Sequence, residues 1–118
     1  MKRAIWGIVA AVMLAGIALT AQGKQDFTLV NRTGLVITEL YVSPTEDDEW
    51  GEDILGRDVL KNGESADISF SRREKACKWD MKIVDEDDDE VVWTAIDLCK
   101  ASHITLRYEG KKPTAIIK

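Results

Sequence analysis

The stretch from Cys77 to Cys99 constrains the fold of this chain more than any other. Two apolar arms, Trp79–Val84 and Val91–Leu98, flank a wholly acidic run, Asp85–Glu90. The only two cysteines of the chain lie at the outer ends of these arms. Runs rich in β-branched and aromatic residues on either side of a short polar turn are typical of a β-hairpin. We therefore predict a hairpin with an acidic tip.

The cysteines predict how this hairpin is closed. If Val84 faces Val92 across the turn, Cys77 falls opposite Cys99, and we expect a structural disulfide between them. The bond would close a loop of about 22 residues and stabilise the fold by on the order of 3 kcal/mol. The same register puts Asp97 on the inner face and both Ile96 and Leu98 on the outer face of the second arm. The predicted inner face consists of Trp79, Met81, Ile83, Val91, Trp93 and Ala95.

The N-terminus has the pattern of a targeting segment. Lys2 and Arg3 precede an uncharged run, Ala4–Ala21, and small residues surround Gly23. We predict a signal peptide over residues 1–23 with cleavage after Gly23. An uncleaved anchor is the alternative, because an uncharged run of about 18 residues reaches the lower limit for spanning a bilayer. Export to the periplasm or the medium, without a stable membrane anchor after cleavage, agrees with the use of a disulfide.

The rest of the chain, residues 24–118, predicts one all-β domain. Short runs with alternating apolar residues follow one another closely, and no amphipathic helix of ordinary length interrupts them. We predict an antiparallel β-sandwich or small barrel of about 7–8 strands. We expect the first two strands to form a hairpin, and Asn62-Gly63 to mark another. Besides the two arms, the expected strands are Phe27–Asn31, Leu35–Ser43, Ser65–Phe70, Ile104–Tyr108 and residues 115–117.

The acidic tip is the first candidate functional site. Asp85, Asp87 and Asp89 alternate along the chain, and oxygen ligands at alternating positions are typical of Ca²⁺-binding loops. A divalent cation would relieve the repulsion between these carboxylates. The EF-hand pattern itself is absent, and a solvated acidic turn is the alternative interpretation. We predict weak Ca²⁺ binding at this tip.

A second acidic run lies between Glu46 and Asp53. If this loop folds beside the hairpin tip, its carboxylates could complete the cation site. We name Asp47, Asp48 and Asp53 as possible additional ligands. Trp50, in the same loop, is the one tryptophan that we expect to contact a ligand, because Trp79 and Trp93 lie at core positions of strands.

Several short motifs together resemble a family of small exported bacterial all-β domains without an assigned activity. The resemblance covers roughly residues 27–106 and implies an exported, disulfide-bearing domain with no catalytic residues. In sequences of that kind the loop reads Asp-x-Asp-Gly-Asp, whereas Asp88 stands at the glycine position here. The motifs are Asn31-Arg32-Thr33-Gly34, Tyr41-Val42-Ser43-Pro44, Trp50-Gly51, Leu60 with Gly63-Glu64, Trp79-Asp80, Val84-Asp85-Glu86-Asp87 and Asp97-Leu98-Cys99.

Composition argues against two classes of function, nucleic-acid binding and catalysis. The formal net charge is −5, which disfavours a general binder of nucleic-acid phosphate. His103 is the only histidine and has no nearby nucleophile motif, so we expect no enzyme. We predict a non-enzymatic binding or structural module. The alternative is an acidic partner module, such as an envelope inhibitor of a cationic, lysozyme-like enzyme, with salt-sensitive association.

Overall fold

The computed structural model describes residues 8–13 and 23–118, and within them every regular element is a β-strand. These residues contain no helix, and so none with the length and apolar character of a membrane span. The strands are β1 (Ile8–Met13), β2 (Phe27–Arg32), β3 (Ile37–Pro44), β4 (Ser65–Phe70), β5 (Lys78–Asp85), β6 (Glu90–Asp97), β7 (His103–Glu109) and β8 (Lys112–Ile117).

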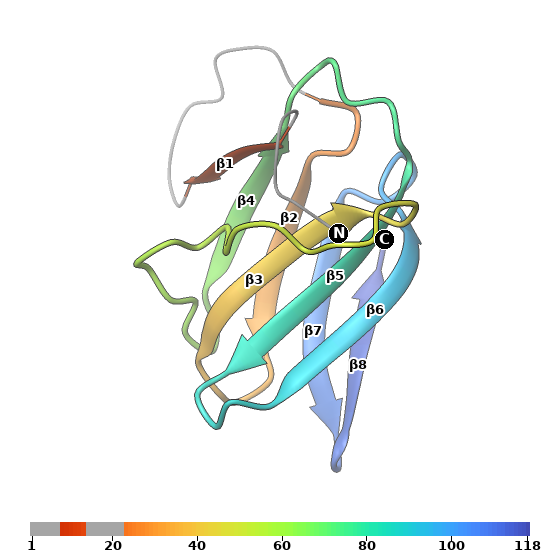
Figure 1. The fold of residues 1–118 in the computed structure, drawn as a ribbon. Coiled ribbons are helices and arrows are strands. Elements are labelled where there is room, and N and C mark those ends of the chain that lie inside the picture. The colour runs from red at the N-terminus through yellow and green to blue at the C-terminus, as the bar shows by residue number, and fades with distance from the viewer. Residues whose placement is uncertain (1–7, 14–22) are drawn as a thin grey trace.

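The strands form two sheets that pack face to face (Figure 1). One sheet has the order β1-β4-β2-β7-β8 and the other the order β3-β5-β6. All neighbours are antiparallel except β2 and β7, which are parallel. The predicted all-β fold is therefore confirmed, and of the two predicted architectures the sandwich, not a closed barrel, is present.

The core lies between the two sheets. Alternate side chains of each strand point inward, as the period of two in a strand requires. Trp79 of β5 is completely buried, and its ring meets Phe70 of β4 edge-on with the ring centroids 4.9 Å apart. Met81 and Ile83 share this buried face, as predicted. The first arm of the hairpin is thus the central strand of its sheet and carries much of the core.

The predicted signal peptide, residues 1–23, lies mostly outside the described residues. Of its residues, Ile8–Met13 form β1, which pairs with the outer edge of β4. Gly23 approaches Phe70 so closely that a Cβ atom there would lie 2.7 Å from the Phe70 carbonyl oxygen. Only glycine fits this approach. Cleavage after Gly23 stays a prediction.

The two hairpins predicted before β4 are wrong. β2 pairs with β4 and β7, whereas β3 pairs with β5 in the other sheet, so the chain crosses between sheets after β2. The Asn62-Gly63 turn does precede β4. However, Leu60 in front of it bridges to Ile37 of β3 and does not pair with β4. Turn residues indicated where the chain bends but not which strands become neighbours.

A buried asparagine holds this crossing. Asn31 is fully buried at the end of β2, and its Nδ2 donates to the carbonyl oxygens of Leu35 and Leu60, both at 2.8 Å. Its Oδ1 accepts from the backbone N–H and the hydroxyl of Thr33. Although Asn31-Arg32-Thr33 matches a glycosylation sequon, its amide is enclosed in the fold. Asn31 therefore acts as a structural bridge between β2, the following turn and Leu60.

The hairpin register differs from the prediction. Val84 pairs with Glu90 rather than Val92, and beyond Met81 the register shifts, so that Trp79 pairs with Ile96. Near this shift Ala95 has a φ of 53°. These features define a β-bulge, which inserts one extra residue into a strand and inverts the faces beyond it.

The bulge corrects four predicted positions in the second arm. Ile96 and Leu98 point into the core, not outward. Ala95 is exposed rather than internal. Asp97 leaves the core face, lies 3.8 Å from the Lys78 ammonium and accepts the Cys99 N–H. The predicted cost of an internal carboxylate therefore does not arise.

A carboxylate fixes the bulge in place. The side chain of Asp80 is buried, and its Oδ1 accepts hydrogen bonds from the Ala95 N–H at 2.9 Å and from the Thr45 hydroxyl at 2.8 Å. A strand prediction from alternation alone puts Asp80 on an open outer face. The structure instead uses it to satisfy the backbone that the bulge removes from the ladder.

Ala95→Gly should stabilise the protein by about 1 kcal/mol. Alanine at positive φ suffers a steric clash at Cβ that glycine avoids. The Ala95 N–H to Asp80 is kept in the variant. Urea unfolding measures the effect. Thr94→Gly is the matched control, because Thr94 is equally exposed but lacks positive φ. We expect it to destabilise by about 0.5–1 kcal/mol, and stabilisation of both variants would contradict the bulge geometry.

Candidate metal site

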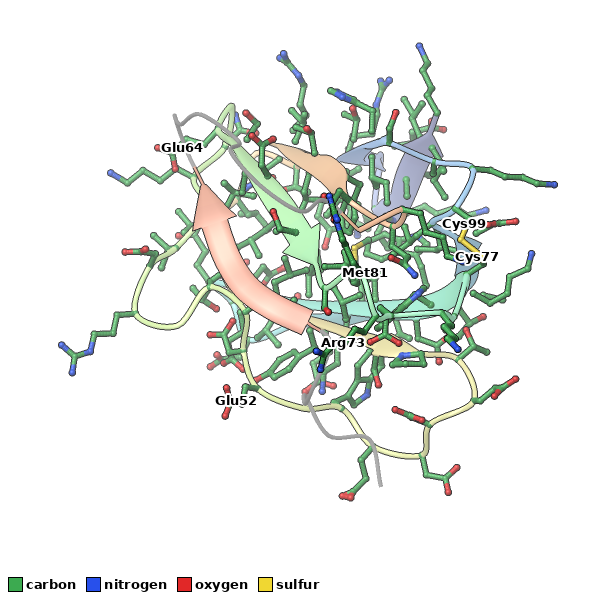
Figure 2. All side chains as sticks on the ribbon, turned by 90° about the horizontal axis from the view of Figure 1, so that it is seen from above. Glu52, Glu64, Arg73, Cys77, Met81 and Cys99 are labelled. Atoms are coloured by element: carbon green, nitrogen blue, oxygen red, sulfur yellow. A yellow bond between two sulfur atoms is a disulfide. The ribbon has the colours of Figure 1, made fainter. Side chains whose placement is uncertain are left out.

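The two candidate features of the hairpin lie at its opposite ends. Cys77 and Cys99 form the predicted disulfide, with their Cα atoms 5.1 Å apart. Figure 2 shows this bond at the periphery and Met81 further inside. The acidic tip between β5 and β6 lies at the other end of the sandwich (Figure 1). The disulfide therefore stabilises the hairpin without taking part in the tip.

The tip is a turn organised by its first aspartate. Oδ1 of Asp85 accepts the backbone N–H groups of Asp87, at 2.8 Å, and Asp89, at 3.1 Å. The Asp88 N–H donates to the Asp85 carbonyl oxygen, and Asp88 has a φ of 63°. This is the position at which the predicted resemblance would place glycine. Aspartate takes the same left-handed conformation here, as short polar side chains can.

Three carboxylates converge at this turn. One oxygen each of Asp85, Asp87 and Asp89 lies within 4.8 Å of the other two. Asp85 is only 2 % exposed, and its Oδ2 has no hydrogen-bond partner in the described structure. Asp87 and Asp89 are exposed. A buried carboxylate oxygen without a donor is costly, whereas a cation beside it would remove that cost.

Glu86 has a different role in the loop. Its N–H donates to the Val36 carbonyl oxygen, and its Oε1 accepts the Val36 N–H, both at 2.9 Å. This reciprocal pair attaches the tip to the segment before β3. The Thr38 hydroxyl adds a 3.1 Å bond to the Val84 carbonyl oxygen. The backbone of the tip is therefore held by β3, and the aspartates project from a fixed frame.

Tyr108 of β7 faces the same carboxylates from the other sheet. Burial raises the pKa of Tyr108, and the negative charges of Asp85 and Asp89 raise it further. The side chain of Asp85 and the charge of Asp87 add to the rise. The sequence predicted Tyr108 only as a strand residue, because the carboxylates beside it come from a distant segment.

The structure does not bring the predicted additional ligands to this site. Asp47 and Asp48 follow β3 at the end where Pro44 pairs with Trp79, whereas the tip adjoins the end where Ile37 pairs with Asp85. Six residues of strand separate these ends, or about 20 Å at 3.3 Å per residue. The shared site depended on the two acidic runs meeting, and the strand register places them at opposite ends of β3.

Asp53, the third possible additional ligand, binds backbone N–H groups away from the tip. The loop returns along β3, and Oδ1 of Asp53 accepts the N–H groups of Leu40, at 2.9 Å, and Leu55, at 3.0 Å. Burial raises the pKa of Asp53, and these two bonds oppose the shift. Asp53 thus serves as an anchor for the loop in the middle of β3. A charge run in the sequence gives no sign of which of its members will be used in this way.

The three aspartates suit a hard divalent cation. Ca²⁺ takes six to eight oxygen ligands at about 2.3–2.6 Å, and three carboxylates can supply up to six of them, with water completing the shell. A second group, Cys77, Asp97 and Cys99, also lies close together. Its sulfur atoms are joined in the disulfide and offer no thiolate. The acidic tip is therefore the better candidate.

Comparison with known proteins identifies the architecture only. No model of a known protein family matches the chain, and no curated protein matches it. A solved structure does: an NMR structure of a protein from Eubacterium rectale, with a TM-score of 0.54 and 12% sequence identity, over 78% of this chain and 85% of that one. The likeness shows a shared fold. The resemblance to a family of exported domains stays a prediction.

Proposed function

We propose that this protein is an exported, non-enzymatic binding module that holds Ca²⁺ weakly at Asp85, Asp87 and Asp89. The observation that carries the proposal is the buried, unpartnered Oδ2 of Asp85 within a group of three carboxylates. The turn uses only Oδ1 of Asp85, which accepts two backbone N–H groups, and leaves the buried Oδ2 without a donor in this group of three carboxylates. The disulfide is compatible with export.

Cation binding would act chiefly on stability. The carboxylates repel one another in the absence of a cation, and the tip joins β5 to β6 while Glu86 joins it to the segment before β3. A bound Ca²⁺ would fix this end of the hairpin, opposite the disulfide. Two exposed ligands imply an affinity near the millimolar range of extracellular modules.

Calcium should therefore raise the thermal midpoint of the protein. With a dissociation constant near 1 mM, 10 mM Ca²⁺ stabilises the fold by about 1.4 kcal/mol. Each kcal/mol corresponds to roughly 4–8 °C for a domain of this size. Thermal unfolding is recorded with CaCl₂, with NaCl of equal ionic strength and with chelator. No rise beyond the NaCl control would contradict the proposal.

Matched variants separate a cation site from general charge screening. Asp87→Asn and Asp89→Asn should unfold at a slightly higher temperature without Ca²⁺, because one repulsive charge is gone, and should lose most of the Ca²⁺ response. Asp88→Asn removes a charge from the same turn, tolerates positive φ and lies outside the group of three. It should keep the full response, as should Asp47→Asn. Equal losses in all four variants would indicate screening alone.

A further inference from the structure

A second feature, separate from the tip, lies on the outer face of the β3-β5-β6 sheet. Tyr41 of β3 and Trp50 of the following loop have ring centroids 6.5 Å apart with the planes inclined at 57°. The ammonium of Lys82 lies over both rings, 4.6 Å from the Tyr41 centroid and 5.3 Å from that of Trp50. We call Tyr41 and Trp50 the aromatic cradle. Lys82 shows that its geometry accepts a cation.

Strand pairing holds the cradle in place and leaves its surroundings open. Tyr41 pairs directly with Lys82, and Lys82 with Val92 of β6. Val92 is 47% exposed, and Tyr41, Trp50 and Lys82 are each only partly buried. Tyr41, Lys82 and Val92 therefore form a row across the three strands of the sheet. The row is rigid because its members come from neighbouring strands, and it is accessible because it lies on the face opposite the core.

The charges around the cradle are predominantly negative. Glu39 accepts the Tyr41 hydroxyl proton in a hydrogen bond. This bond comes first among the causes that raise the pKa of Tyr41 to about 12, followed by burial and the charges of Glu39, Asp53 and Glu90. The carboxylates of Glu39, Asp53 and Glu90 thus act on the cradle, and within residues 23–118 Lys82 is the cation placed over both of its rings. A further cation is electrostatically favoured there.

We propose that the aromatic cradle is a docking surface for a basic protein segment, and that an arginine or lysine side chain of this partner stacks on Tyr41 and Trp50 in place of Lys82. Arginine suits the site best, because its planar guanidinium stacks on rings and pairs with carboxylates. The net charge of −5 would attract such a partner over distance. The cradle is thus occupied internally by a cation that an external one can replace.

The direct test uses a fluorescein-labelled peptide, Gly-Arg-Gly-Arg-Gly, and fluorescence anisotropy at 0.1 M salt. Lys82→Met removes the internal competitor, and we expect it to tighten binding by about two- to fivefold, the range of an exposed cation–π contact. Lys78→Met is the matched control. It removes the same charge from the same face of β5, about 13 Å away, which is beyond the Debye length at 0.1 M salt. Equal tightening in both variants would overturn the proposal.

Variants of the ring test the stacking itself without changing the charge. Trp50→Leu should weaken peptide binding severalfold, while Trp50→Phe should keep part of it. A peptide with glutamine in place of both arginines should not bind. Unchanged affinity in Trp50→Leu would overturn the proposal. If Trp50→Leu folds poorly, the peptide affinity of Lys82→Met tests the proposal instead. Since Tyr41 and Trp50 are not among the three aspartates of the candidate cation site, repeating the titration with chelator should leave the result unchanged.

Discussion

Replacing Asn31 with alanine is expected to lower the free energy of unfolding by about 3–4 kcal/mol. The change removes one of two donors from each of the carbonyl oxygens of Leu35 and Leu60, which keep the Thr33 hydroxyl and the Ile37 N–H, and it removes the acceptor of the Thr33 N–H and hydroxyl. The four hydrogen bonds of the Asn31 amide are lost together, and each contributes roughly 0.5–1.5 kcal/mol net. Chemical denaturation followed by tryptophan fluorescence measures the difference. A loss below 1 kcal/mol would contradict the role we assign to Asn31.

A neighbouring asparagine provides the control. Asn62 bonds the Gly34 N–H from the same corner of the fold, but this contact is exposed. Asn62→Ala should cost no more than about 1 kcal/mol, since water can replace the lost partner. Asn31 also has a consequence for the candidate site. It fixes the turn that leads to Val36, and Val36 is the residue to which Glu86 attaches the acidic tip. We therefore expect Asn31→Ala to weaken the Ca²⁺ response as well.

Removal of the disulfide should destabilise the protein by about 3 kcal/mol. Cys77 and Cys99 are 22 residues apart, and opening a loop of this length returns conformational entropy to the unfolded chain. The double variant Cys77→Ser/Cys99→Ser avoids an unpaired thiol and is compared with the oxidised protein by urea unfolding. The same loss should follow when the wild-type protein is treated with reductant. Unchanged stability in both experiments would show that the hairpin is held by its core alone.

The disulfide and the tip should act independently. They lie at opposite ends of β5, and effects at sites more than about 10 Å apart without shared partners usually add. The Ca²⁺-induced rise in the midpoint is therefore expected to be similar in the double serine variant and in the wild type. A Ca²⁺ response that disappears with the disulfide would indicate that the tip is ordered by the far end of the hairpin.

The sequence was informative wherever local alternation decided the structure. Trp79, Met81 and Ile83 alternate with polar residues, and they do form the core face of β5. The cysteine pair was also predicted correctly, although through a register that is wrong at the tip. Beyond the bulge Lys78 pairs with Asp97, so Cys77 lies opposite Leu98 and one position from alignment with Cys99, which is still close enough for the disulfide. An alanine gives no signal for such a bulge, and the inversion of Ile96 and Leu98 could not be foreseen.

Long-range neighbours were beyond the sequence for a physical reason. Alternation tells which side chains share a face, but not which strand lies beside which. The parallel pairing of β2 with β7 and the return of the acidic loop along β3 depend on the whole sandwich. The three clustered aspartates were predicted because they lie in one turn. Tyr108, and the separation of Asp47 and Asp48 from that turn, required the tertiary structure.

The hairpin between the two cysteines also bears on the order of folding. β5 and β6 join residues that are close in the chain, whereas β2 must find β7 across the distance from Thr28 to His103. Local pairings form in about 1–10 μs, while distant ones are slowed by loop closure. We therefore expect the hairpin to form early and to bring its thiols together before the rest of the sandwich assembles. Oxidation at that stage would make the hairpin a covalent template on which the remaining strands collect.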